Sequence, residues 1–209
     1  MAFDIDVFVA DCREARSHSD APERLAGLLR EAVADPAAIT AAMDARQAGM
    51  SPRPMVDWLF EEDGLRICQI ACLPQAFGVP HDHAGWAVIG VYAGTEFFNV
   101  YEEAEGGLRK VRRDVLEAPS VEILPADLIH DMENPSTETS GSLHIYGSAR
   151  WDGGRRIWRD ENSPPEPSSV EKAYAYAVEL TRRRRMELGL GDLSIPTLSE
   201  LIPGSGKAE

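Results

Sequence analysis

The sequence GVPHDHAGWAVIGVYAGTE, residues 78–96, decides the fold and the chemistry predicted for this chain. It sets the tripeptide His81-Asp82-His83 directly before an apolar run that glycines interrupt. On an extended strand, side chains two residues apart point to the same face, about 7 Å apart at Cα. Both imidazole rings can then reach one metal ion, and neutral imidazole is a common ligand of iron, zinc, copper and nickel. Because the chain has only five histidines, this pair predicts a metal site.

The stretch lies within a zone of short strands, predicted over residues 57–160. Turn residues such as Gly, Pro, Asn and Asp separate its apolar segments. Many short strands at this spacing are typical of an antiparallel sandwich or barrel. The segments are LRICQIACL, GWAVIGVYAG, TEFFNVYE, LRKVRRDVLEA, SVEILP and GSLHIYGSA. We therefore predict a mainly β core domain.

Helical patterns flank this zone on both sides. Residues 1–56 are predicted as a helical N-terminal flank, because apolar residues recur there at helical spacing. Residues 161–209 begin with the linker-like stretch ENSPPEPSS and continue into a helix from Val170 to Leu188. An open sheet edge needs covering, and these flanks can fill that role.

Composition narrows the classes of partner. The formal net charge of −14 argues against nucleic acid and against an anionic membrane surface, although local arginines can still hold a small anionic substrate. No apolar run approaches the ~20 residues of a membrane span. The acidic N-terminus is unlike a signal peptide, and the three cysteines fit reduced thiols. A cytoplasmic location is therefore expected.

Two further motifs place histidines in the same zone. The segment PADLIHDMEN holds His130, followed four positions later by an asparagine. In the segment SLHIY, the side chains of Ser142, His144 and Tyr146 alternate onto one face of the predicted strand. Beside a metal, this row can form a hydrogen-bond relay that ends in a phenol. The alternative is a core strand whose polar side chains satisfy one another.

These motifs resemble the cupin superfamily and, within it, the thiol dioxygenase branch of cysteine and 3-mercaptopropionate dioxygenases. The likeness covers about residues 60–160 and rests on PHDH, the stretch from Trp86 to Glu96, IHDMEN and SLHIYG. In the cupin pattern an HxH pair is followed by Pro-x-Gly-x-x-His-x-x-x-Asn, and only Asp127 departs from it here. The resemblance implies a double-stranded β-helix, or jelly-roll barrel.

The resemblance also implies the metal and its ligands. Most cupins have a glutamate ligand four or five residues past the second histidine, where this chain has Ala87 and Val88. The expected ligand set is therefore His81, His83 and His130, holding Fe(II).

By the same resemblance, His144 and Tyr146, together with Ser142, are catalytic residues beside the metal. A site with four histidines, including His144, is the alternative. Glu96 receives no catalytic role.

Arginines decide the predicted substrate. A guanidinium binds a carboxylate bidentately, and the pair Arg155-Arg156 follows the SLHIY segment as in mercaptopropionate-type enzymes. We predict Arg156, then Arg155, as the anchor of the substrate carboxylate. An anchor at Arg53 would favour cysteine instead.

The predicted function is thus a non-haem Fe(II) dioxygenase that oxidises a small thiol carboxylate to its sulfinate with O₂. The partners are the thiol and O₂. Two alternatives stay open. One is another metal-dependent cupin enzyme, with zinc, nickel or manganese and a non-thiol substrate. The other is a cupin that serves as a small-molecule binding or sensory protein.

Overall fold

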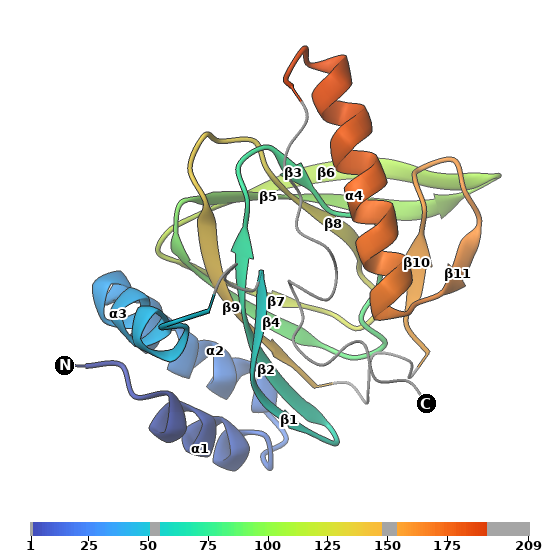
Figure 1. Ribbon diagram of the computed structural model, residues 1–209. Helices are drawn as coiled ribbons and strands as arrows, with labels where there is room; N and C mark the ends of the chain where they lie inside the picture. Colours follow the sequence, from blue (N-terminus) through green and yellow to red (C-terminus); the bar gives the residue numbers. More distant parts are fainter. Residues whose placement is uncertain (1, 51–54, 148–153, 192–209) are drawn as a thin grey trace, which may run out of the picture.

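Two antiparallel sheets face each other in the computed structural model, which describes residues 2–50, 55–147 and 154–191 (Figure 1). One sheet has the strand order β1-β2-β9-β4-β7 and the other has the order β3-β8-β5-β6. Neighbouring strands are often distant in the sequence, as in a jelly roll. The predicted class, a mainly β jelly roll with helical flanks, is confirmed. Arg53 lies outside the described residues.

The elements have these bounds. The first sheet contains β1 (Val56–Glu62), β2 (Leu65–Cys72), β4 (Ala87–Ala93), β7 (Ser120–Leu124) and β9 (Ser140–Tyr146). The second contains β3 (Ala76–Phe77), β5 (Thr95–Ala104), β6 (Gly107–Glu117) and β8 (Ile129–Asn134). A small ribbon pairs β10 (Arg156–Trp158) with β11 (Pro165–Pro167). The helices are α1 (Ile5–Ala15), α2 (Ala21–Val33), α3 (Pro36–Arg46) and α4 (Val170–Glu187).

The N-terminal helices cover the outer face of the first sheet (Figure 1). Leu25 and Leu29 of α2 are fully buried against Val88 of β4 and the apolar face of β9. Each such side chain contributes about 1.5–3 kcal/mol relative to exposure. Gly90 permits the close approach, since a Cβ there would lie 3.2 Å from the Leu29 side chain. One face of this sheet is therefore a structural core.

The other face of the same sheet lines the barrel interior. Along β9, Leu143 and Ile145 pack toward the helices, whereas Tyr146 joins the interior cluster with Cys68 and Phe98. Successive side chains of a strand point to opposite faces, so Tyr146, and with it the other even-numbered residues of β9, faces inward. The alternation predicted for SLHIY is confirmed.

Helix α4 lies on the far side of the barrel, against β3 (Figure 1). Leu180 packs on Val79 and Ile157, and Thr181 Oγ1 accepts a hydrogen bond of 3.0 Å from the Phe77 backbone. No helix within the described ranges is long and apolar enough to cross a membrane.

Candidate metal centre

Three histidines from two distant segments meet inside the barrel. One ring nitrogen of each of His81, His83 and His130 lies within 4.8 Å of the others, and this group can hold a metal ion. The Nε2 atoms of His83 and His130 are 2.8 Å apart. His83 and His130 are buried, whereas His81 is partly exposed. The structure thus brings together the three residues that the sequence predicted as ligands.

The HxH pair does not lie on a regular strand, contrary to the expected placement. His81 forms isolated bridges to His130 and Ile157, so this segment runs between β8 and β10. Its extended run is short because the chain turns at Ala84, which has a φ of 50°. The bridge nevertheless fixes the register, since the backbones of His81 and His130 exchange hydrogen bonds of 2.9 and 3.0 Å.

The hydrogen bond on the far side of the His81 ring favours a metal. His81 Nδ1 lies 2.9 Å from the Val79 carbonyl oxygen and donates to it, which leaves a lone pair on Nε2. His130 Nδ1 is buried and has no hydrogen-bond partner among the described residues. Three converging imidazole nitrogens without a carboxylate fit a borderline divalent ion such as iron or zinc.

Burial keeps these rings neutral. It lowers the pKa of His81 to about 4, with a further contribution from the Arg155 cation. It lowers the pKa of His83 and His130 well below the ordinary value of 6.5, and the neighbouring histidines add to the effect. A metal ligand must be deprotonated, so the lone pairs of the cluster are available at neutral pH.

Arg155 lies directly beside the histidines. Its guanidinium is buried, with Nη2 3.0 Å from His83 Nδ1 and Nε 3.1 Å from the Asp82 carbonyl oxygen. It also lies over the Tyr146 ring, 5.7 Å from the centroid. Burial lowers the pKa of Arg155 to about 10, which leaves it charged at neutral pH.

Arg156, placed first by the sequence prediction, points the other way. Its Nε donates to Asp82 Oδ2 at 2.7 Å and its Nη1 to Glu103 Oε1 at 2.7 Å, on the outside of the barrel. Adjacent residues of a strand face opposite sides, and the pairing of β10 selects which arginine faces inward. Of the two predicted arginines, the structure therefore brings Arg155 and not Arg156 to the histidine cluster. The Asp82 carboxylate pairs with Arg156 and is not part of the three-histidine group.

The predicted row on β9 forms a continuous chain of hydrogen bonds. Ser142 Oγ lies 2.9 Å from His144 Nε2, and His144 Nδ1 lies 2.9 Å from the Tyr146 hydroxyl. Burial lowers the pKa of His144 to about 3 and raises that of Tyr146 well above 10. Both groups are therefore neutral. The Tyr146 ring lies 5.2 Å from the His83 ring, so the chain ends at the metal centre.

Glu96 extends this chain of hydrogen bonds. The sequence analysis missed this role of Glu96. Its side chain is fully buried, and Oε1 accepts hydrogen bonds of 3.0 Å from both Ser140 and Ser142. A signal was present in the sequence, because Glu96 alternates with Phe98 and Val100 on the inward face of its strand. A carboxyl group on an apolar face needs a polar partner.

Arg66 is a second buried guanidinium that the sequence analysis did not single out. It lies opposite Tyr146 across the β2–β9 ladder and stacks on Trp58, 4.2 Å from the ring centroid. Glu61, which is exposed, pairs with it at 3.1 Å. Together, Arg66 and Arg155 make the surroundings of Tyr146 electropositive, which suits an anionic ligand.

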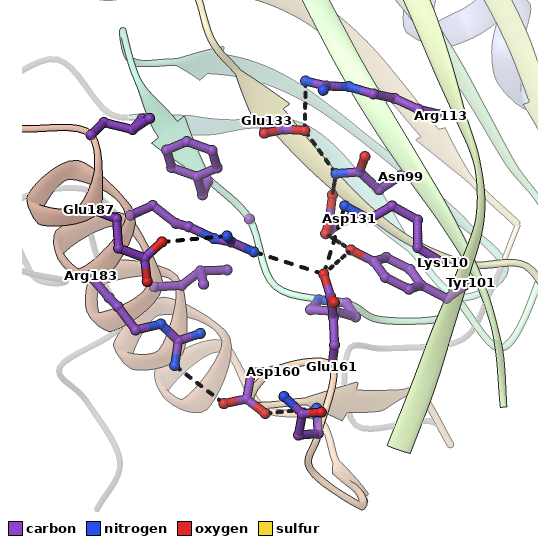
Figure 2. A pocket seen from close by; sticks show the side chains of 17 residues that line it. Asn99, Tyr101, Lys110, Arg113, Asp131, Glu133, Asp160, Glu161, Arg183 and Glu187 are labelled. Atoms are coloured by element: carbon purple, nitrogen blue, oxygen red, sulfur yellow. Dashed lines mark hydrogen bonds and ion pairs between the residues drawn. The ribbon is translucent and has the colours of Figure 1, made fainter. Parts of the chain in front are cut away.

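A separate hollow of about 310 Å³ lies between α4 and the outer face of the second sheet (Figure 2). Asp131 lines it, because it alternates with the inward-facing His130 on β8. Its charged side chains pair with one another, as in Arg113 with Glu133 at 2.8 Å. The hollow and the histidine cluster therefore lie on opposite faces of one strand.

No protein-family model and no curated protein matches the sequence. Among solved structures, an oxalate oxidase in complex with glycolate aligns with a TM-score of 0.37 at 18% identity, over 44% of this chain and 45% of that chain. A cupin-2 domain containing protein from Shewanella frigidimarina aligns with a TM-score of 0.35 at 17% identity, over 46% and 79%. A DMSP lyase aligns with a TM-score of 0.36 at 20% identity, over 53% and 47%. The chain spans about half the length of the oxalate oxidase and DMSP lyase chains with which it aligns.

Proposed function

We propose that this protein is an Fe(II)-dependent dioxygenase that oxidises a small thiol carboxylate to its sulfinate. The observation that carries the proposal is the convergence of His81, His83 and His130 beside Tyr146 and Arg155. Bound Fe(II) supplies a redox centre for O₂ and a Lewis acid that favours the thiolate form of the substrate. The balanced reaction is RSH + O₂ → RSO₂H, in which sulfur gives four electrons and both oxygen atoms bind to it.

Arg155 binds the substrate carboxylate in this proposal. Its charged, buried guanidinium lies within hydrogen-bond distance of His83, so a carboxylate that reaches it stays close to the metal ligands. A guanidinium holds a carboxylate through two parallel hydrogen bonds, which fixes the substrate's orientation as well as its charge. Fixed orientation favours reaction at the thiol end of a short molecule.

Tyr146 holds a proton on its hydroxyl oxygen. The phenol is neutral at all physiological pH values because burial raises its pKa. His144 Nδ1 holds the hydroxyl in place through a hydrogen bond of 2.9 Å, and Ser142 holds the other nitrogen of His144 through a second hydrogen bond of 2.9 Å. A neutral hydroxyl held next to a reacting anion stabilises charge that develops there.

The test is oxygen uptake by the Fe(II)-loaded protein with a panel of thiols. The panel contains 3-mercaptopropionate, cysteine and cysteamine, and cysteamine lacks the carboxylate. We expect one O₂ consumed for each sulfinate formed, detected by mass spectrometry, with the two carboxylates preferred over cysteamine. His83→Ala is the inactive control, and His18→Ala, in the N-terminal flank, is the matched active control.

Stoichiometric iron binding without oxygen uptake for any thiol would contradict the proposal. So would purified protein that contains zinc, nickel or manganese and gains no activity when iron replaces them. Either result would favour a metal-dependent cupin enzyme with a non-thiol substrate. Tight retention of a ligand without turnover would favour a binding protein.

A further inference from the structure

Glu96 is a buried carboxyl group with little to stabilise its charge. Both of its hydrogen bonds reach Oε1, while Oε2 is buried without a partner among the described residues. Burial raises the pKa of Glu96 to about 7, against the smaller opposing effect of the two serine hydroxyls. A carboxyl group that changes charge near neutral pH therefore lies at the start of the chain that ends at Tyr146.

The side chains that face Glu96 are uncharged. Cys72 and Tyr92 titrate only above neutral pH, since burial raises the pKa of both groups. The exposed Glu117 pairs with Thr95 and so lies on the opposite face of the sheet from Glu96. No ion pair reaches Glu96 in the part of the chain that the structure describes. By contact or strand register, its neighbours are Ser140 and Ser142 of β9, Cys72 of β2, Tyr92 of β4, Leu116 of β6 and Asn134 of β8.

When Glu96 is ionised, a count of the available hydrogens gives the direction of each hydrogen bond between Glu96 and Tyr146. A carboxylate only accepts, so Ser142 donates its single hydrogen to Glu96. Ser142 Oγ must then accept from His144 Nε2–H. Because His144 is neutral and carries one ring hydrogen, its Nδ1 accepts from the Tyr146 hydroxyl. The phenol hydrogen is used up, and Tyr146 can only accept from a ligand in the site.

Protonated Glu96 allows the opposite direction. The acid can donate to Ser142, which is then free to donate to His144 Nε2. His144 carries its hydrogen on Nδ1 and donates to the Tyr146 oxygen. His144 then no longer holds the hydrogen of the Tyr146 hydroxyl, so Tyr146 can donate it to a ligand in the site or to the Cys68 sulfur beside it.

We infer that Glu96 is a positioning residue whose proton sets the direction of the Ser142–His144–Tyr146 chain, and thereby decides whether Tyr146 donates a hydrogen bond to the substrate. The inference rests on the proposed dioxygenase activity only for its effect on catalysis. The hydrogen-bond switch itself belongs to the protein without metal or thiol.

The decisive experiment is ¹⁵N NMR of the ring nitrogens of histidine-labelled, metal-free protein between pH 5 and 9. His144 is assigned by its loss in His144→Asn. We expect its hydrogen on Nδ1 at low pH and on Nε2 at high pH, with a midpoint of about 7. In Glu96→Gln, one tautomer should persist across the whole range. Glu117→Gln, on the neighbouring strand, is the matched control and should keep the wild-type midpoint.

A second variant guards against misfolding of Glu96→Gln. Ser142→Ala leaves Glu96 in place but cuts the chain, so the His144 tautomer should no longer follow pH. A wild-type tautomer that stays constant from pH 5 to 9 would overturn the inference, as would a switch that survives in Glu96→Gln. Kinetics give the second readout. The kcat of the wild type should change with pH around 7, and the kcat of Glu96→Gln should not. A tautomer switch in a protein that oxidises no thiol would leave the inference standing and overturn the proposed function alone.

Discussion

At the residue scale, His83 connects the three-histidine group to Arg155, the proposed substrate anchor. Because the Arg155 guanidinium only donates, His83 accepts at Nδ1 and carries its hydrogen on Nε2, where it meets His130. A metal ion on His83 Nε2 requires the other tautomer, with the hydrogen on Nδ1. The metal and the Arg155–His83 hydrogen bond therefore exclude each other.

Arg155→Gln should have two effects, one on metal binding and one on substrate binding. Metal affinity should rise, because a buried cation next to the site is removed. The KM for 3-mercaptopropionate should rise roughly 10- to 100-fold, because a hydrogen-bonded charge contributes about 1.5–3 kcal/mol. Isothermal titration with Fe(II) under anaerobic conditions and steady-state kinetics measure the two effects.

Arg156→Gln separates the neighbouring arginines. Its guanidinium pairs with Asp82 and Glu103, so we expect the KM to stay within about twofold of wild type. A large rise in KM for Arg156→Gln with none for Arg155→Gln would restore the order predicted from the sequence.

Tyr146→Phe is the corresponding change at the end of the hydrogen-bond chain. We expect kcat to fall roughly 10- to 100-fold, because one hydrogen bond of about 1.5–3 kcal/mol to a charged group is lost. Iron content should not change, since Tyr146 is not part of the three-histidine group. Oxygen-uptake kinetics and iron analysis of the same samples check both statements, and loss of iron would place Tyr146 among the ligands.

At the element scale, two glycines test how α2 packs on the first sheet. A Cβ on Gly90 of β4 would lie 3.0 Å from Val33 and 3.2 Å from Leu29. Gly90→Ala should therefore lower the free energy of unfolding by about 1–3 kcal/mol. Gly27, within α2 itself, has nothing within 4 Å of the same added atom. Gly27→Ala should raise the free energy of unfolding by about 0.5–1 kcal/mol, since glycine is a poor helix former.

Urea denaturation of both glycine variants measures these differences. Opposite signs would show that the added methyl group destabilises the protein only at Gly90, where it meets Leu29 and Val33 of α2. Equal stability of Gly90→Ala and wild type would mean that α2 moves away from β4 at little cost.

The elements also show what the sequence could and could not reveal. Ser142, His144 and Tyr146 were predictable because a strand's period of two is local. The meeting of His130 with the HxH pair followed from the resemblance of two spaced motifs. The choice between Arg155 and Arg156 was not predictable, because it depends on how β10 pairs with the His81 segment. The bond from Glu96 to Ser142 joins strands far apart in the chain, and no local pattern encodes that approach.

At the scale of the whole molecule, charge is divided between surface and interior. The chain carries a net charge of −14, yet two buried guanidiniums, Arg66 and Arg155, flank Tyr146. The proposed substrate, a small anion, must therefore approach an acidic surface before it reaches an electropositive interior. Added salt weakens the long-range repulsion more than the buried attraction. Moderate salt is thus expected to raise kcat/KM, as steady-state kinetics at several ionic strengths can measure.

Glu96 also makes global stability depend on pH. Its pKa rises from 4.5 to about 7 on folding, so between these pH values the unfolded chain has lost a proton that the folded protein keeps. Stability is therefore lost as pH rises through this range, by about 3 kcal/mol in total. His81 and His144 act in the opposite direction at lower pH, because their folded pKa values of about 4 and about 3 lie below 6.5.

Comparison of the metal-free wild type with Glu96→Gln isolates the carboxyl group, because both proteins contain the same histidines. From pH 5 to pH 8, the wild type should lose about 2 kcal/mol more stability than the variant, as measured by urea denaturation at each pH. The difference should level off above the folded pKa of about 7, where Glu96 is ionised in both states. Parallel stability curves for the two proteins would mean that Glu96 keeps an ordinary pKa in the folded protein, and the low-pH donor form of Tyr146 would then be absent at neutral pH.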